Sequence, residues 1–388
     1  MDSIVRPSWK ARRLKDFLSN NGTDSSTENP GSSPVVGVLN GTGIGPEVVS
    51  AALAVLKTIE QIIGLRFDVR HGGLVGEDAE ACFGRSFPES VAAFCQDIFD
   101  LKGAILSGPG GGRYVYDLRR QFDLFCKFVP IQPWPQLARV GRIVDRHTQS
   151  MDMLFVRDNI GGVYQGQWRE RSSSEGRVVE HSFSYSESEV RRLIAVAARA
   201  ASARRGKMHV ILKDGGIPGI SALWRDVGAA TARDHDIQVV FMNVDLAAYE
   251  LIQNSSQFDV VVTPNLLGDI LVDIAGALQG SRGVTFSGNF RPDGGAVYQT
   301  NHGCAHDLAG RDIANPAGQI LSLAMLLRES FGLDEGACLI ERALARAWQQ
   351  GWRTADLAEP GCTVLGTRAM GERIVEQILS LAEARQTA

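Results

Sequence analysis

The chain has 388 residues, which is enough for one large domain or for two domains of ordinary size. Its hydrophobic content of 44% and charged content of 22% are ordinary for a globular protein, and its net charge of −4 excludes the basic face that nucleic-acid binding requires. No apolar run approaches the roughly 18 residues of a membrane span, the sequence has no signal-peptide core, and its cysteines are widely spaced. We therefore predict a cytoplasmic protein with reduced thiols and with no membrane or nucleic-acid partner.

The first 33 residues differ in composition from the rest of the chain. Small polar residues dominate 19–27 and 31–33, and such segments cannot bury enough apolar surface to order themselves. Residues 1–18 include a basic run at 10–13 and are either a short helix or a tail. We predict that residues 1–33 form a disordered or flexible N-terminal segment.

From residue 34 onward, short apolar segments alternate with longer amphipathic ones. The apolar segments predict strands at residues 35–39, 66–69, 103–106, 153–156, 209–212, 238–241 and 259–262. Helices are predicted between many of them, for example at residues 46–60, 189–204 and 219–233. This alternation is typical of an α/β protein with a mostly parallel sheet.

Residues 161–186 interrupt the alternation. Apolar and aromatic side chains are mixed with polar ones there, which predicts an antiparallel ribbon. Because an exposed two-stranded ribbon is marginally stable alone, we expect it to pair with another subunit. Residues after 316 are predicted to be mostly helical.

Two carboxylates, Asp269 and Asp273, follow the predicted strand at 259–262. If a helix starts near Gly268, residues four apart lie on one face about one turn apart. Oxygen ligands at that position suit a divalent metal ion, whereas the alternative is a solvated helix start that favours acidic residues. A third carboxylate, Asp245, follows the strand at 238–241 and favours the metal hypothesis.

Glycine-rich turns also follow predicted strands. Residues 40–47 connect a strand to a helix through three glycines, and backbone amides in such a turn can face an anion, although a tight connection alone explains it equally well. Further along, the loop at 301–316 places His302, Asp307 and Asn315 among glycines before a long helix. Such groups suit an adenine edge and a ribose diol.

Together these residues resemble the β-decarboxylating dehydrogenases, the family of isocitrate and isopropylmalate dehydrogenases. The resembling segments, in matching order, are residues 41–48, 118–124, 156–166, 244–245, 265–273 and 302–316. The resemblance implies an isopropylmalate dehydrogenase-like two-domain α/β fold. Its large cofactor-binding domain is expected to comprise residues 34–129 and 283–388, and its small domain residues 130–282, with a dimerisation arm at about 160–187.

The resemblance implies a metal site shared between two subunits. Asp269 and Asp273 match the Mg²⁺ or Mn²⁺ ligands of one subunit, and Asp245 matches the ligand and catalytic residue contributed by its partner. A homodimer with shared active sites is therefore the minimal active unit. By the same resemblance His302, Gly303, Asp307 and Asn315 contact the cofactor.

An acidic residue at the Asp307 position resembles the NAD-preferring members, because it accepts hydrogen bonds from both ribose hydroxyls and repels a 2′-phosphate. We therefore predict NAD as the cofactor.

At the substrate end the chain departs from the family pattern. Arg119 and Arg157 match two of the three arginines that bind substrate carboxylates, but the middle position is Val129. If residues 126–130 are extended, Lys127 lies on the same face as Val129 and supplies a replacement charge; alternatively it points to solvent. A lysine donates from a point rather than a fork, so carboxylate recognition is expected to change.

The acid–base residues depart from the pattern as well. Tyr164 matches the general acid that protonates the enolate carbon. Its partner in the family is a lysine that follows an aspartate, whereas here the order is Lys213 then Asp214. Either a one-residue slip permitted by the next two glycines returns Lys213 to the site, or Asp214 stands where an amine is expected.

These features predict an NAD- and divalent-metal-dependent dehydrogenase that oxidatively decarboxylates a malate-like 2-hydroxy acid with an atypical third substituent, in a specialised pathway. The alternatives are dehydrogenation or decarboxylation alone, and a catalytically silent regulatory subunit that binds nucleotide or substrate.

Overall fold

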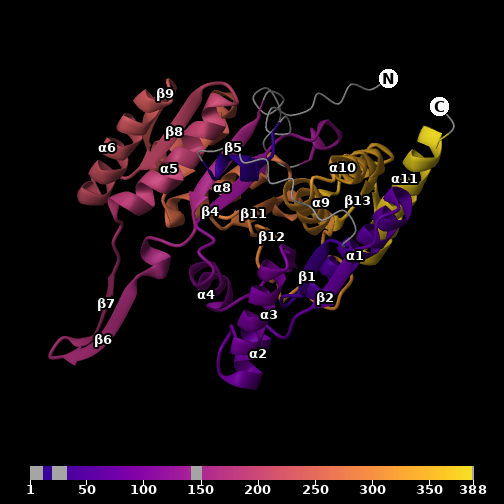
Figure 1. Ribbon diagram of the computed structural model, residues 1–388, viewed down its shortest axis with the longest axis horizontal. Coiled ribbons are helices and arrows are strands. Elements are labelled where there is room, and N and C mark those ends of the chain that lie inside the picture. The colour runs from indigo at the N-terminus through magenta and orange to yellow at the C-terminus, as the bar shows by residue number, and fades with distance from the viewer. Residues whose placement is uncertain (1–11, 20–32, 141–150, 387–388) are drawn as a thin grey trace.

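The computed structural model describes residues 12–19, 33–140 and 151–386 (Figure 1). One large sheet has the strand order β2-β1-β3-β12-β11-β4-β5-β10-β8-β9. Its strands in chain order are β1 (Val35–Leu39), β2 (Asp68–His71), β3 (Ala104–Ser107), β4 (Cys126–Ile131), β5 (Met153–Asp158), β8 (Lys207–Leu212), β9 (Gln238–Asn243), β10 (Val260–Thr263), β11 (Phe286–Phe290) and β12 (Ala296–Thr300).

Most neighbouring strands of this sheet run parallel, but its centre is antiparallel. Strands β2, β1, β3 and β12 are parallel at one end, and β5, β10, β8 and β9 are parallel at the other. Between them, β11 is antiparallel to both β12 and β4, and β4 is antiparallel to β5. The predicted α/β fold with a mostly parallel sheet is confirmed. The domain boundaries expected at 129/130 and 282/283 fall within β4 and just before β11. Strands of both expected domains therefore belong to one continuous sheet.

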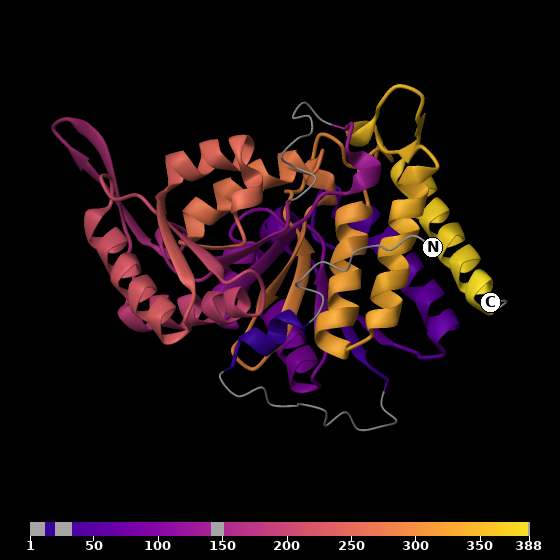
Figure 2. The ribbon, with the colours of Figure 1, turned by 90° about the horizontal axis from the view of Figure 1, so that it is seen from above.

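Helices cover both faces of the sheet (Figures 1 and 2). Helices α9 and α5 lie on one face, where α1 and α10 pack against α9 and α11 packs against α1 and α10. Helices α3, α7 and α8 cover the other face. The helices are α1 (Gly45–Ile63), α2 (Gly76–Phe83), α3 (Glu89–Asp100), α4 (Tyr114–Gln121), α5 (Glu187–Ser202), α6 (Pro218–Asp234), α7 (Val244–Gln253), α8 (Asn265–Leu278), α9 (Ala317–Phe331), α10 (Asp334–Gln349) and α11 (Thr367–Gln386).

Strand β10 illustrates how the sequence separates the two faces. Val260 and Val262 are buried in the core that includes α5, whereas Val261 is buried in the core beneath α8. This alternation follows from the two-residue period of a strand. Since both faces are covered, the strand is apolar throughout, as is usual for a buried parallel strand.

The N-terminal segment is partly ordered, which corrects the prediction for residues 1–33. Leu14–Phe17 form a 3-10 helix, and both Leu14 and Phe17 are buried. The backbone amide of Leu14 donates to the Glu329 carboxylate of α9, and Arg199 of α5 donates to the Phe17 carbonyl over 2.7 Å. The segment therefore bridges the two ends of the sheet, while residues 1–11 and 20–32 lie outside the described part of the chain.

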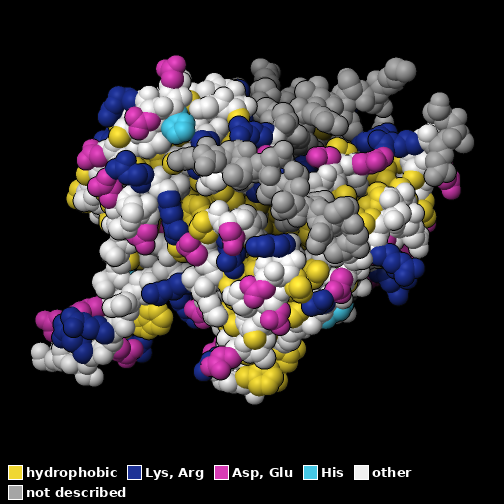
Figure 3. Space-filling model, viewed as in Figure 1, with side chains coloured by type: hydrophobic (Ala, Val, Ile, Leu, Met, Phe, Trp, Pro, Cys, Tyr) yellow, Lys and Arg dark blue, Asp and Glu magenta, His cyan; other side chains and the backbone are white. Residues whose placement is uncertain are grey.

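The predicted ribbon is confirmed as an antiparallel pair, β6 (Gln167–Ser173) and β7 (Gly176–Ser182). It projects from the body of the molecule, as Figures 1 and 2 show. Its surface carries charges of both signs (Figure 3), including the ion pair between Arg177 and Glu170 at 3.1 Å. Trp168 and Val179 expose more than half of their surface, as suits a segment that packs on another molecule.

The carboxyl-terminal third is mostly helical, as predicted, and contains one short strand pair, β13 (Trp352–Arg353) and β14 (Thr363–Val364). A search of the described helices finds none with the length and apolarity needed to cross a membrane.

Candidate active site

Helix α8 carries Asp269 and Asp273 at the end of β10. The helix begins at Asn265, three residues before the predicted start, so both aspartates lie inside it. A Cβ atom at Gly268 would lie 2.0 Å from the hydroxyl oxygen of Thr263, which means that glycine is needed for the first turn to pack against the strand end. This close packing brings Asp269 within hydrogen-bond reach of β5.

Asp269 connects two of the predicted site residues. One carboxylate oxygen accepts from Nη1 of Arg157 at 2.6 Å, and the other accepts from the Tyr164 hydroxyl at 2.7 Å. Asn265 holds the same guanidinium, because its side-chain oxygen accepts from Nε at 3.2 Å and from Nη2 at 2.8 Å. The orienting role of Asn265 could not be predicted from the sequence, because the helix was expected to begin near Gly268.

Three cationic side chains converge beside Asp269. Lys127 on β4 stands directly opposite Arg157 on β5 and opposite Asn289 on β11. Lys127 is 3% exposed, Arg157 2% and Arg119 5%. The alternative in which Lys127 points to solvent is therefore excluded, and Val129 is buried in the core beneath α8.

Two of these cations have no anionic partner among the residues that the structure describes. Burial lowers the pKa of Lys127, and the charges of Arg119 and Arg157 lower it further against the opposing effect of Asp269 and Asp273. Burial also lowers the pKa of Arg119 to about 10. Within the described residues, neither Arg119 nor Lys127 makes an ion pair or a side-chain hydrogen bond, and Nε of Arg119 is buried without a partner. Because a buried unpaired charge costs several kcal/mol, this arrangement favours an anionic ligand.

Asp273 provides a second carboxylate on the same helix face. It pairs with Arg282, whose Nη2 lies 2.9 Å away. Burial raises the pKa of Asp273, Arg282 opposes this, and the charge of Asp269 raises it again. Two mutually repelling, partly exposed carboxylates are a donor set that fits a hard divalent cation such as Mg²⁺ or Mn²⁺.

Asp245 does not join Asp269 and Asp273 in a three-ligand cluster within the described residues of one chain. It lies in the first turn of α7, where one oxygen accepts from Nζ of Lys213 at 2.8 Å. The Asp245 side chain is largely exposed, and that of Lys213 is partly exposed. This placement leaves Asp245 and Lys213 available to a second molecule, which is what the expected shared site requires.

Asp214 is directed away from Lys213. Its carboxylate accepts from Nη2 of Arg225 at 2.7 Å, and its backbone amide donates to the Asn243 side chain at 2.9 Å. The connection between β8 and α6 thus places the lysine, and not the aspartate, beside Asp245.

Tyr164 lies in a short 3-10 turn before the arm. Burial raises the pKa of its phenol, and the hydrogen bond to Asp269 raises it further, so the group is protonated at neutral pH. The Tyr116 ring centroid is 5.2 Å from that of Tyr164, and Arg113 donates to the Tyr164 carbonyl at 3.2 Å. Tyr114, at the start of α4, is buried in the core, and its hydroxyl lies 2.9 Å from that of Ser107.

The expected cofactor residues lie in the loop between β12 and α9. The ring of His302 contacts the Gly303 carbonyl through Nδ1 at 3.0 Å, and its Nε2 is buried without a partner in the described residues. Asp307 is exposed, whereas the Asn315 amide nitrogen donates to Asp356 at 3.0 Å. His302 and Asp307 thus have polar atoms free to meet a ligand, and Asn315 is already engaged at the start of α9.

Comparisons with known proteins identify the family to which this chain is similar. The family model for isocitrate/isopropylmalate dehydrogenase matches residues 35–374. The 3-isopropylmalate dehydrogenase of Aquifex aeolicus is 34% identical over 364 residues, covering 90% of this chain and 98% of the relative. That of Methylococcus capsulatus is 37% identical over 356 residues, covering 88% and 97%. The crystal structure of isocitrate dehydrogenase from Methylococcus capsulatus superposes with a TM-score of 0.77 at 29% identity, covering 89% of this chain and 99% of that one.

Proposed function

The chain belongs to the isocitrate/isopropylmalate dehydrogenase family, and from that premise we propose that it is an NAD- and divalent-metal-dependent dehydrogenase that decarboxylates a malate-like 2-hydroxy acid. The observation that carries the proposal is a pair of buried cations, Arg119 and Lys127, near the carboxylate of Asp269 and without an ion-pair partner in the described part of the chain. Such a site stabilises a ligand that brings carboxylates to the cations and a metal ion to the aspartates.

The three cations bind and orient the substrate. Arg157 is fixed by Asn265 and Asp269, so it presents its guanidinium in one orientation. Arg119 and Lys127 supply the remaining positive charge in a site from which water is largely excluded, where each charged hydrogen bond is stronger than in water. Together they hold the substrate in one orientation beside α8.

Asp269 and Asp273, with Asp245 of a second chain, would hold Mg²⁺ or Mn²⁺. Bound there, the ion would supply Lewis-acid polarisation of the substrate hydroxyl oxygen, and NAD would supply the hydride acceptor. Tyr164 is protonated and hydrogen-bonded to Asp269, so it is poised to donate a proton to the enolate carbon left by loss of CO₂. Lys213 is proposed as the base, because Asp214 is bound to Arg225.

NAD is proposed over NADP because of Asp307. Its carboxylate is exposed in the loop that also carries His302. A carboxylate at that position accepts from two ribose hydroxyls and repels a 2′-phosphate.

A homodimer is proposed from an apolar face beside Asp245. Leu246, Tyr249 and Ile252 of α7 and Ile270 of α8 each expose more than 40% of their surface. Side chains of this size on two helices that pack together are typical of a protein interface. Pairing this face with a second copy would carry Lys213 and Asp245 toward the partner.

The substrate is proposed to differ from those of the standard family reactions. Lys127 offers a point charge in place of a guanidinium fork, and Tyr116 packs beside Tyr164 and Arg119 at the edge of the site. An NAD-linked turnover screen of isopropylmalate, isocitrate, homoisocitrate, malate and tartrate with Mg²⁺ tests this. Efficient turnover of isopropylmalate would refute a specialised substrate, and absence of metal binding by calorimetry would instead support a regulatory subunit.

A further inference from the structure

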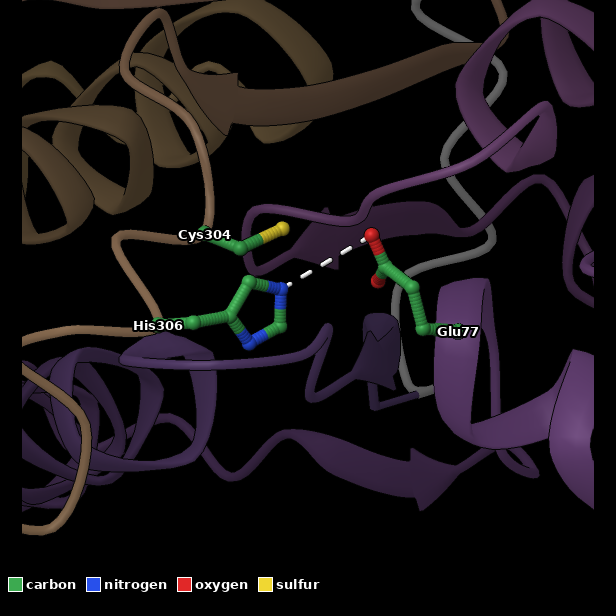
Figure 4. A group of neighbouring side chains, drawn as sticks. All are labelled: Glu77, Cys304 and His306. Atoms are coloured by element: carbon green, nitrogen blue, oxygen red, sulfur yellow. Dashed lines mark ion pairs between the residues drawn. The ribbon is translucent and has the colours of Figure 1, made fainter.

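A second group of candidate metal ligands involves none of the carboxylates of α7 and α8. Glu77 lies in the first turn of α2, and Cys304 and His306 lie in the loop between β12 and α9 (Figure 4). One ligand atom of each residue lies within 4.8 Å of the other two. In the described part of the chain, no other group of three such side chains meets this condition.

The distance between His306 and Glu77 is close to that of two ligands in a metal site. Nε2 of His306 is 3.7 Å from Oε1 of Glu77, and Figure 4 shows the Cys304 sulfur beside the same gap. Two ligands bound to tetrahedral Zn²⁺ at about 2.0–2.1 Å lie roughly 3.4 Å apart, so this pair needs to move by only a few tenths of an ångström. The Thr42 hydroxyl lies 3.0 Å from the Glu77 carboxylate and 3.0 Å from the Cys304 sulfur, which holds both toward one point.

The backbone is built to bring these segments together. The Ile44 amide donates to the Cys304 carbonyl at 2.9 Å, and a Cβ atom at Gly43 would lie 2.1 Å from that oxygen. A Cβ atom at Gly111 would lie 1.7 Å from a carboxylate oxygen of Glu77. The sulfur-bearing residue is buried, but the side chains of Glu77 and His306 are 47% and 58% exposed, so an ion from solvent can reach the group.

We propose that Glu77, Cys304 and His306 form a binding site for a borderline-soft divalent ion such as Zn²⁺. Thiolate, imidazole and carboxylate are the three ligand types that Zn²⁺ takes in proteins, and three protein ligands leave the fourth position for water. Mg²⁺ instead prefers the all-oxygen carboxylates of α8, so the two sites differ in the metal they select. The Cys304 thiol must lose its proton to ligate, so binding releases a proton to solvent.

The bound ion would join α2 to the loop that carries His302 and Asp307. It would therefore restrain the 301–316 loop in the absence of any substrate. This site does not depend on the proposed dehydrogenase activity, because its ligands include none of the residues assigned to the reaction.

The test uses the full chain in excess Mg²⁺, which occupies the carboxylate site, with Co²⁺ as a spectroscopic probe and Zn²⁺ as its competitor. We expect one Co²⁺ per chain with a thiolate-to-metal charge-transfer band that Zn²⁺ removes. The band should disappear in Cys304→Ser, which keeps a group able to bond Thr42. His306→Ala and Glu77→Gln should weaken binding at least about tenfold, the lower limit typical of disrupting a metal site.

Cys82→Ser is the matched control, because Cys82 is an exposed thiol on the same helix as Glu77 but outside the group. Its band and affinity should equal those of the wild type. The proposal is overturned if the wild type gives no thiolate band, if the band survives in Cys304→Ser, or if it is lost equally in Cys82→Ser. His306→Ala alters only a largely exposed side chain, so it tests the site even if Cys304→Ser fails to fold.

Discussion

Lys127 is the residue at which this chain departs most clearly from a three-arginine substrate site. It is buried on β4 opposite Arg157, and its ammonium has no ion-pair partner in the described residues. An ammonium donates from a point, whereas a guanidinium presents a planar fork that fixes a carboxylate in its plane. A substrate carboxylate bound at Lys127 would therefore be less constrained in orientation. The substrate could then carry a third substituent that differs from those of the standard family substrates.

Replacing Lys127 with methionine should reduce activity without reducing stability. Removing one partner of a buried charged hydrogen bond costs about 2–5 kcal/mol, so kcat/KM is expected to fall roughly 30- to 5000-fold. The substrate-free protein should melt at an equal or higher temperature, because an unpaired buried charge has been removed. Steady-state kinetics and thermal melting measure the two effects.

The control for this substitution is Lys127→Arg, which keeps the charge and adds the fork. It should retain more activity than Lys127→Met and alter the order of preference among the hydroxy acids tested. Equal kinetics for the wild type and Lys127→Met would show that Lys127 does not bind substrate.

Lys213 and Asp214 are adjacent in sequence but opposite in role. Lys213→Ala should lower kcat by about 10²- to 10⁴-fold, the usual contribution of a general acid or base. Asp214→Ala should leave kcat within a few-fold of the wild type, because its carboxylate is bound to Arg225. A pH–rate profile distinguishes a proton-transfer role from a structural one, since loss of the base removes one limb of the profile. The assignment is wrong if Asp214→Ala is the more damaging change.

Much of the site could be predicted residue by residue. The motif positions Arg119, Arg157, Tyr164 and Asp269 lie together as the resemblance implied. Whether the Lys127 side chain is buried or exposed could not be predicted. The two-residue period of a strand assigns a side chain to one face of the sheet, but it does not reveal that α8 covers that face. The order of Lys213 and Asp214 could not be resolved either, since the turn before α6 decides which side chain faces Asp245.

At the scale of elements, the apolar parallel strands were predicted, whereas strands β11 and β12 near the centre of the sheet were not. Strands β1, β5, β8 and β10 are apolar on both faces and stand out in the sequence. Strand β11 contains Gly288 and Asn289, which are poor strand formers. Asn289 can nevertheless be buried, because its side chain forms hydrogen bonds with the Asn159 side chain and the Val297 carbonyl. Tertiary hydrogen bonds that compensate a buried polar residue are invisible to local pattern reasoning.

A short helix was one of the two possibilities for residues 1–18, but the burial of Leu14–Phe17 could not be predicted, for a related reason. Its two apolar residues are three apart in a polar stretch, and only the cleft between α5 and α9 supplies the surface that buries them. The contact also places a carboxyl group, Glu329, beneath the segment, where burial raises its pKa to about 7.

Glu329 should make stability depend on pH near neutrality. A carboxyl group whose pKa is raised on folding contributes stability that is fully present below its unfolded pKa and is lost as pH rises through the folded value. With the pKa raised from 4.5 to about 7, the wild type should lose up to about 3 kcal/mol relative to Glu329→Gln as pH rises from 4 to 8. Urea unfolding across this pH range measures the difference. Parallel pH profiles for the two proteins would contradict the prediction.

At the scale of the whole molecule, the residues proposed for the reaction lie in two separate groups on one chain. Arg119, Tyr164 and Asp269 gather between the two ends of the sheet, whereas Lys213 and Asp245 form an exposed pair at the start of α7. The exposed apolar side chains of α7 and α8 lie next to the second group. A two-fold symmetric dimer would bring each exposed pair to the partner's Tyr164.

Hybrid dimers test this arrangement directly. Tyr164→Phe disables one half of the site and Lys213→Ala the other, so each homodimer is expected to be nearly inactive. In a hybrid of the two chains, one site receives both substitutions and the other receives none. Co-expression with random pairing makes half of the dimers hybrid, so the mixture should recover about a quarter of wild-type activity. Purification through two different tags should raise this to about half, because every remaining dimer then has one intact site. Recovery would require that Tyr164 and Lys213 act from different chains, whereas failure of tagged, stable hybrids to recover activity would place the whole site within one chain.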